Sequence, residues 1–260
     1  MRKFIAVVLI IGLSVSCKKT VASEVVELDA KDGVIIVNAD SIKKPKPIIP
    51  KERLLGKVDY KTDSLFTQVS SEHSSKLLYL NKECYNNFID MYNKAKLDSV
   101  NLKIISGTRN FTEQKAIWER KWNLNNQLPP NERALKILEY SSMPSTSRHH
   151  WGTDIDINNL NNSYFETGKG KLEYEWLKVH ANSFGFYQVY TSKENGRTGY
   201  NEEKWHWSYL PIASKYLEAY NASITLDDIN DFMGNETARD LQVIKNYVNG
   251  ISEAAKTYKN

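Results

Sequence analysis

Apolar residues recur at helical spacing in several separate parts of the chain. The clearest run lies between Lys82 and Leu97, where seven apolar positions repeat every three or four residues. The same reasoning, together with capping residues, predicts helices over Glu113–Trp122 (N-cap Thr112), Pro130 to about Tyr140, Tyr174–Phe184 (ending at Gly185) and Pro211 to about Tyr220.

Short segments between these helices alternate apolar and polar residues, as strands do. They are Asn101–Ile105, Asp154–Ile157 and Trp205–Tyr209, and the aromatic and β-branched residues of Phe186–Tyr190 predict a further strand. In the second of them, two isoleucines share one face and two aspartates the other. We expect an α+β fold, with a small antiparallel sheet flanked by helices and a helical C-terminal extension.

The first residues have a different character. Arg2-Lys3 precedes the apolar run from Phe4 to Leu13, which is too short to span a bilayer as a helix. Ser14-Val-Ser-Cys17 follows and resembles the lipobox of bacterial lipoproteins, although Ser14 stands where that pattern prefers Leu. Residues 1–16 are therefore expected to be a lipoprotein signal peptide and Cys17 the lipidated residue. A plain secretory signal is the alternative.

The pattern also divides the rest of the chain. Residues 17–54 include a possible hairpin at Asp32-Gly33 and a stretch rich in Pro and Lys, which predicts a semi-rigid tether. The main domain is expected over residues 55–220. Residues 221–260 show two helical patterns joined at Gly234, which predicts the helical extension.

Composition narrows the class of protein only a little. The chain has 260 residues, 41% of them hydrophobic, and a formal net charge of +4, which gives no reason to expect nucleic acid. With Cys17 lipidated, Cys84 has no partner and is expected as a buried thiol. We expect an exported monomer, anchored by lipid at the cell envelope and most simply periplasmic.

Two separated stretches carry residues that suit a metal. His149 and Asp156 lie in the first, and His206 in the second. Two imidazoles and one carboxylate form the three-ligand set of a catalytic zinc site, which leaves one position open. Glu203 is the candidate general base. Strand alternation at His206 would turn Glu203 to the opposite face, so Glu203 must lie before the strand, across a bend.

These motifs resemble those of zinc D-alanyl-D-alanine carboxypeptidases of the vancomycin-resistance type, in the superfamily with lysostaphin and the hedgehog domain. The shared pattern is Ser147-x-His149-x-x-Gly152-x-x-x-Asp156 followed by Glu203-x-x-His206-Trp207. Ser106-Gly-Thr-Arg109, with Gln114 five residues later, resembles a further segment of that family. The resemblance covers roughly residues 75 to 215.

The resemblance implies roles for particular residues. His149, Asp156 and His206 would bind Zn²⁺, and Glu203 would be the general base. Arg109 would face the substrate carboxylate or the developing oxyanion. Ser147, Gln114, Asp154 and Trp207 are the candidate substrate-binding residues. His150 is expected beside the site rather than on the metal.

Two positions depart from the family pattern. Asp154 stands where the family usually has Ala, and it could pair with Arg109 or His150 or bind a ligand amine. It could equally be a solvated or salt-bridged acid. Thr108 replaces the usual Tyr before the arginine. Trp205 and Trp207 lie on one strand face, which favours a core position over a binding platform for Trp207.

The expected function is removal of the C-terminal D-alanine from peptidoglycan stem peptides by a zinc D,D-carboxypeptidase. An L,D-carboxypeptidase or an endopeptidase acting on the stem is the alternative among enzymes, because the motif residues do not separate the three. A zinc-holding cell-wall binding module without turnover is the alternative outside enzymes. The presence of Glu203 argues against that module, since a binder needs no general base.

Overall fold

The computed structural model describes residues 49–259 of the chain. The expected signal peptide, the lipidated Cys17, the hairpin at Asp32-Gly33 and most of the tether lie outside the described residues. The described residues belong to one compact unit by their mutual contacts. Within residues 49–259, no helix is long and apolar enough to cross a membrane.

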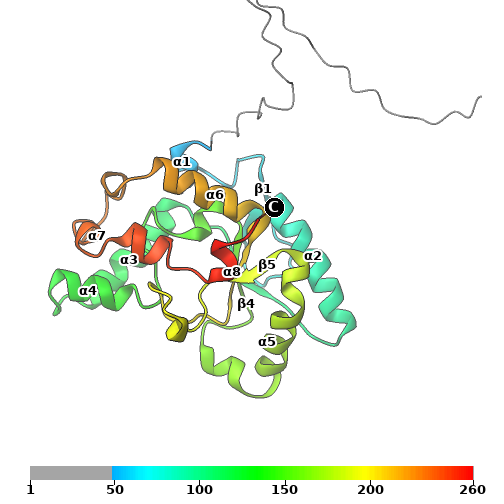
Figure 1. The fold of residues 1–260 in the computed structure, drawn as a ribbon. Coiled ribbons are helices and arrows are strands. Elements are labelled where there is room, and N and C mark those ends of the chain that lie inside the picture. The colour runs from blue at the N-terminus through cyan, green and yellow to red at the C-terminus, as the bar shows by residue number, and fades with distance from the viewer. Residues whose placement is uncertain (1–48, 260) are drawn as a thin grey trace, which may run out of the picture. The chain divides into compact units, whose positions relative to one another are not determined.

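The sequence order mixes helices with short strands (Figure 1). The longer helices are α2 (Lys82–Leu97), α3 (Phe111–Leu124), α4 (Pro130–Ile137), α5 (Gly168–His180) and α6 (Leu210–Ser223). The strands are β1 (Phe66–Gln68), β2 (Tyr79–Asn81), β3 (Ile104–Ser106), β4 (Asp154–Ile157), β5 (Phe186–Gln188) and β6 (His206–Tyr209).

Short helical turns connect these elements. The α-helical ones are α1 (Lys51–Leu54), α7 (Thr237–Asp240) and α8 (Glu253–Lys256). The 3₁₀ turns are η2 (Arg148–Trp151), η3 (Asn162–Glu166), η4 (Ala181–Phe184), η5 (Lys193–Asn195) and η6 (Leu226–Asp228), and η7 (Ile244–Val248) is a π-helical turn.

Two antiparallel sheets organise the chain. β1 pairs with β2, and the second sheet has the order β3-β4-β6-β5 with every neighbour antiparallel. Helices α2 and α5 cover one face of the second sheet, where Ile155, Ile157 and Trp207 join their buried side chains. The expected α+β fold with a small antiparallel sheet is confirmed.

A second core lies among α3, α4 and α6. Trp118, Trp122 and Trp151 are its largest buried members, and residues from Ile224 to Ala255 belong to the same cluster. The C-terminal residues therefore pack into the same core as the helices before them. The two helices predicted there are replaced by the short turns α7, η7 and α8, so this prediction was wrong in length.

Local signals explain where several elements begin and end. α2 has the predicted bounds, and the Asn81 side chain accepts from the backbone N–H groups of Glu83 and Cys84. α3 starts earlier than expected because Asn110, rather than Thr112, is the N-cap and forms a capping box with Glu113. Gly185 follows η4 at φ 81°, a left-handed conformation that favours glycine.

Candidate metal centre and active site

The pairing of β4 with β6 creates the floor of the site. Asp156 lies directly opposite His206, and Asp154 lies opposite Ser208. Because side chains alternate along a strand, these four polar residues share one face of the sheet. Ile155 and Trp207, the pair between them, point into the core on the other face.

His149 reaches the same face from η2. Its Nδ1 donates to the carbonyl of Gly107 at 2.9 Å, which leaves Nε2 3.5 Å from Asp156 Oδ2. The turn ends at Gly152, whose φ of 71° sends the chain into β4. A Cβ there would lie 2.4 Å from the Phe66 ring, so glycine is required for the close approach.

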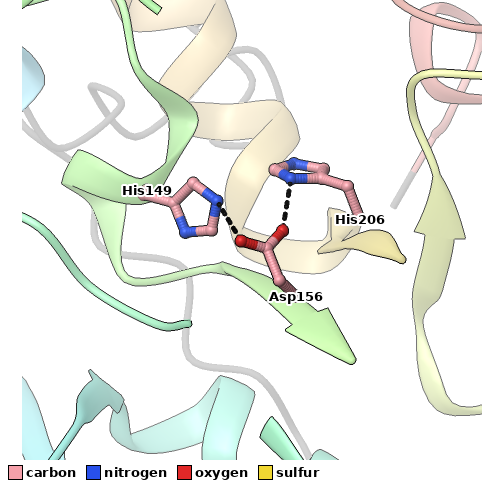
Figure 2. Close-up of side chains that lie close together, drawn as sticks. All are labelled: His149, Asp156 and His206. Atoms are coloured by element: carbon pink, nitrogen blue, oxygen red, sulfur yellow. Dashed lines mark hydrogen bonds and ion pairs between the residues drawn. The ribbon is translucent and has the colours of Figure 1, made fainter. Parts of the chain in front are cut away.

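The three predicted ligands come together (Figure 2). His206 Nδ1 lies 3.0 Å from Asp156 Oδ1, and one donor atom from each of His149, Asp156 and His206 falls within 4.8 Å of the others. All three side chains are buried. Two imidazole nitrogens and a carboxylate oxygen are the donor set of a catalytic zinc site, so these residues fit a metal ion.

The buried ionisable side chains of this cluster shift one another's pKa. Burial disfavours a charged Asp156, but His149 and His206 outweigh burial and lower its pKa. Burial and the nearby Arg109 guanidinium lower the pKa of His149, so this ring is neutral and can offer a lone pair. Burial opposes charge on His206 too, but the hydrogen bonds that its ring donates to Asp154 and Asp156 raise its pKa to about 9. Metal binding should therefore release a proton from His206.

Glu203 lies beside the three ligands, across the predicted bend. The His206 N–H donates to the Glu203 carbonyl at 3.2 Å in the turn before β6, and Glu203 Oε2 lies 3.6 Å from His206 Nδ1. Burial raises the pKa of the Glu203 carboxyl to about 8. A carboxyl group whose pKa lies near neutrality suits proton transfer.

Arg109 stands at the edge of the same cluster. Its Nε donates to Gln114 Oε1 at 3.0 Å, its Nη1 donates to Ser106 Oγ, and Nη1 lies 4.0 Å from Asp156 Oδ2. The side chain is 24% exposed and lines the cavity over the site. Gln114 is almost fully buried, and its amide donates to the Ser142 carbonyl. This second hydrogen bond holds Gln114 in place, and Gln114 in turn holds the Arg109 side chain.

The neighbouring histidine has a supporting role. His150 Nδ1 donates to the Arg109 carbonyl at 2.7 Å, and its Nε2 accepts from the Ser145 N–H at 3.1 Å. Burial lowers the pKa of His150 to about 4, which matches this neutral donor–acceptor ring. His150 is thus beside the site and outside the ligand cluster, as the sequence predicts.

A cavity of about 560 Å³ opens over these residues. Glu203, His149, Asp156 and His206 form its floor, and Arg109 with Lys121 and Arg120 from α3 brings positive charge to one wall. Tyr140, Leu160 and Trp205 add apolar surface. The cavity can therefore take a peptide with an anionic end against a metal and a carboxyl group.

Comparison with known proteins identifies the family to which the chain belongs. The model of the VanY family, D-alanyl-D-alanine carboxypeptidase, matches residues 77–212, just over half of the chain. The chain belongs to this family. The match spans the ligand residues, Glu203, Arg109 and the whole four-stranded sheet.

Two curated proteins are similar to this chain over part of their length. It is 28% identical over 149 residues to "Putative carboxypeptidase YodJ" of Bacillus subtilis (strain 168), covering 55% of this chain and 50% of that protein. It is 26% identical over 142 residues to the D-alanyl-D-alanine carboxypeptidase of Enterococcus faecalis (strain ATCC 700802 / V583), covering 54% and 51%. The chain spans about half the length of these curated relatives.

A solved structure shares the fold. The LdcB LD-carboxypeptidase superposes with a TM-score of 0.50 at 23% identity, covering 71% of this chain and 80% of LdcB. At this identity the likeness concerns the fold alone.

The four candidate substrate residues divide into two pairs. Ser147 and Gln114 line the cavity, and the buried Ser147 hydroxyl has no hydrogen-bond partner among the described residues. Asp154 and Trp207 do not line it. Trp207 is 2% exposed on the core face of β6, and its Nε1 donates to the Lys204 carbonyl. Both placements correct the substrate-binding expectation and agree with the alternatives, a salt-bridged acid for Asp154 and a core residue for Trp207.

Asp154 pairs with a residue that sequence reasoning missed. Its partner is Arg148, at 3.0 Å, rather than Arg109 or His150. Tyr190, whose ring centre lies 4.7 Å from that of His206, was missed too, as was Lys121. Arg148 directly precedes His149, so its place near the site could be predicted from the sequence, whereas its contact with Asp154 depends on the fold. Tyr190 and Lys121 reach the cavity only through the tertiary fold.

Proposed function

We propose that this protein is a zinc-dependent D,D-carboxypeptidase that removes the C-terminal D-alanine from peptidoglycan stem peptides. The observation that carries the proposal is the position of Glu203. It lies 3.6 Å from a ligand nitrogen, buried and outside the ligand cluster, with Arg109 on the same cavity. A binding module has no need of such a carboxyl group.

His149, Asp156 and His206 would hold the zinc. When bound, zinc supplies Lewis-acid polarisation of a carbonyl and lowers the pKa of water. Glu203, as its carboxylate, would take the proton of the attacking water and deliver it to the leaving amine. Its position before β6 keeps the carboxyl group at the ligands without making it one of them.

Arg109 provides a reason for cleavage at a carboxyl terminus. A guanidinium held by Gln114 and Ser106 presents a fixed planar fork, which suits a carboxylate. Lys121 and Arg120 extend the positive wall. A peptide with a free C-terminal carboxylate is therefore favoured over one with a neutral end.

The reaction can be tested with defined peptides and the full chain. A stem pentapeptide ending in D-Ala-D-Ala should release one D-alanine, release should stop with a chelator, and zinc should restore it. A matched pentapeptide with an amidated C-terminus should be cleaved poorly because Arg109 then has no carboxylate.

Mass analysis of the products separates the other activities. Release of D-alanine from a tetrapeptide instead would make the enzyme an L,D-carboxypeptidase, and internal cleavage would make it an endopeptidase. Zinc binding without any cleavage would leave only the binding module.

We also propose that the protein is exported and held at the cell envelope by lipid on Cys17, which would bring it to its peptidoglycan substrate. The support is the basic, apolar and small-residue pattern over residues 1–17. Cys17→Ala should move the protein from the membrane fraction to the soluble fraction. An unchanged distribution would contradict the anchor.

A further inference from the structure

Asp154 is a second carboxylate in contact with a metal ligand. Its Oδ1 lies 3.1 Å from His206 Nε2, while Asp156 Oδ1 lies 3.0 Å from the Nδ1 of the same ring. The register explains this contact: Asp156 is directly opposite His206, and Asp154 is its diagonal neighbour on the same face. The His206 ring is therefore held between two carboxylates.

The two ring nitrogens have different surroundings. Nδ1 faces the ligand cluster, with Asp156 at 3.0 Å and Glu203 at 3.6 Å. Nε2 faces Asp154, which has no exposed surface and does not line the cavity. Nδ1 is thus the nitrogen available to a metal, and Nε2 is the one that carries a hydrogen to Asp154.

Arg148 makes a buried carboxylate possible at this position. Its Nε donates to Asp154 Oδ1 at 3.0 Å and its Nη2 to Ser208 Oγ at 2.6 Å, and Thr153 Oγ1 donates to Asp154 Oδ2 at 2.7 Å. The Arg148 side chain is 1% exposed. A carboxylate buried without a cation would be strongly disfavoured, so Arg148 offsets the charge and leaves Asp154 free to accept from His206.

We propose that Asp154, held by Arg148, is a positioning residue that orients His206 and fixes the hydrogen on Nε2, so that Nδ1 is presented to the metal. This inference rests on the metal site of the proposed function. Carboxylates that accept from the distal nitrogen of a ligating histidine set its ring orientation and raise its basicity, and their loss typically weakens metal binding about 10–100-fold.

The test removes the acceptor without leaving a buried charge unpaired. The double variant Arg148→Met with Asp154→Leu should bind zinc about 10–100-fold more weakly than the wild type in competition with a chromophoric chelator. Asp154→Asn should recover most of the affinity, because its amide oxygen still accepts from Nε2. Arg53→Met with Asp63→Leu is the matched control, since it removes an ion pair of 2.6 Å that does not line the cavity.

Nitrogen NMR of the His206 ring is a second test, and it uses the wild-type protein alone. The wild type should show a slowly exchanging hydrogen on Nε2, both without metal and with zinc. An Nε2 that lacks this hydrogen in the zinc-loaded protein would overturn the proposal, as would wild-type zinc affinity in a folded double variant. If the wild type binds no zinc, the proposed function fails, and the metal-free spectrum still decides the Asp154–His206 contact.

Discussion

The two faces of β4 and β6 differ completely in chemistry although they alternate along the same eight residues. One face carries Asp154, Asp156, His206 and Ser208, and the other carries Ile155, Ile157, Trp207 and Tyr209. Both faces are buried, so the contrast does not come from exposure to water. A slip of one residue in the pairing would exchange the two faces and would destroy the site and the core together.

The contrast teaches how charge is kept in a buried site. The apolar face is stabilised by removal of hydrocarbon from water, which needs no particular partner. Each acid on the polar face has a specific cationic or histidine partner: Arg148 and His206 for Asp154, and His149 and His206 for Asp156. Substitutions on the polar face should therefore change chemistry, and those on the apolar face should change stability.

The largest expected effect is on the polar side. Glu203→Gln should keep zinc and lower kcat about 10²–10⁴-fold, because an amide cannot accept the proton. Zinc content and steady-state turnover of a stem pentapeptide would be measured together. Glu202→Gln is the control, since Glu202 does not line the cavity. Turnover of Glu203→Gln at the wild-type rate would refute the general-base assignment.

The apolar face should respond in stability. Trp207→Ala should lower the free energy of unfolding by about 3–5 kcal/mol, because it empties a fully enclosed core position. Urea titration measures the change. Trp207→Phe is the matched variant, and its KM should equal that of the wild type. A raised KM with unchanged stability would instead make Trp207 a substrate contact.

Arg109→Lys tests the cavity above the polar face. Loss of the planar fork that binds Gln114, Ser106 and a carboxylate should lower kcat/KM about 10–100-fold while zinc is retained. Arg120→Lys, on the same wall, should stay within about twofold of the wild type. Equal effects at the two positions would show that only general positive charge matters.

A further effect concerns how the stability of the metal-free protein depends on pH. Burial raises the Glu203 pKa from 4.5 to about 8, so the folded state keeps a proton that the unfolded chain releases. Its contribution to stability is therefore present below pH 4.5 and is lost as the pH rises to about 8. Glu203→Gln should gain stability over the wild type by up to about 1.4 kcal/mol per pH unit across that range. A pH-independent difference in thermal unfolding would argue against the raised pKa.

Local patterns in the sequence predict much of this architecture. α2 and β4 have the expected bounds because periodicity and flanking signals agree there. The start of α3 was misplaced because Asn110 and Thr112 are both good N-caps, and only Asn110 forms the reciprocal bond with Glu113. The periodicity of residues 221–260 predicts two helices, but contacts with distant segments replace them by short turns: the Thr198 hydroxyl donates to the Asn246 carbonyl, inside η7.

The candidate site also has a part that the sequence predicts and a part that depends on the tertiary fold. That His149, Asp156, Glu203 and His206 lie together could be predicted because their spacing follows the motif that the sequence resembles, and strand alternation predicted the bend between Glu203 and His206. The partner of Asp154 could not be predicted, because the Arg148–Asp154 contact depends on how η2 folds back over β4 and β6. The same holds for Tyr190, which reaches His206 from the segment after β5.

The adjacent histidines have a thermodynamic consequence. His149 donates to the carbonyl of Gly107 and His150 to that of Arg109, so a few hydrogen bonds join the proposed metal ligand His149 to Arg109, the proposed carboxylate-binding residue. A metal would fix one end of this linkage and a carboxylate the other. If each ligand steadies the segment for the other, their affinities are coupled, and each must change the other's affinity by the same factor.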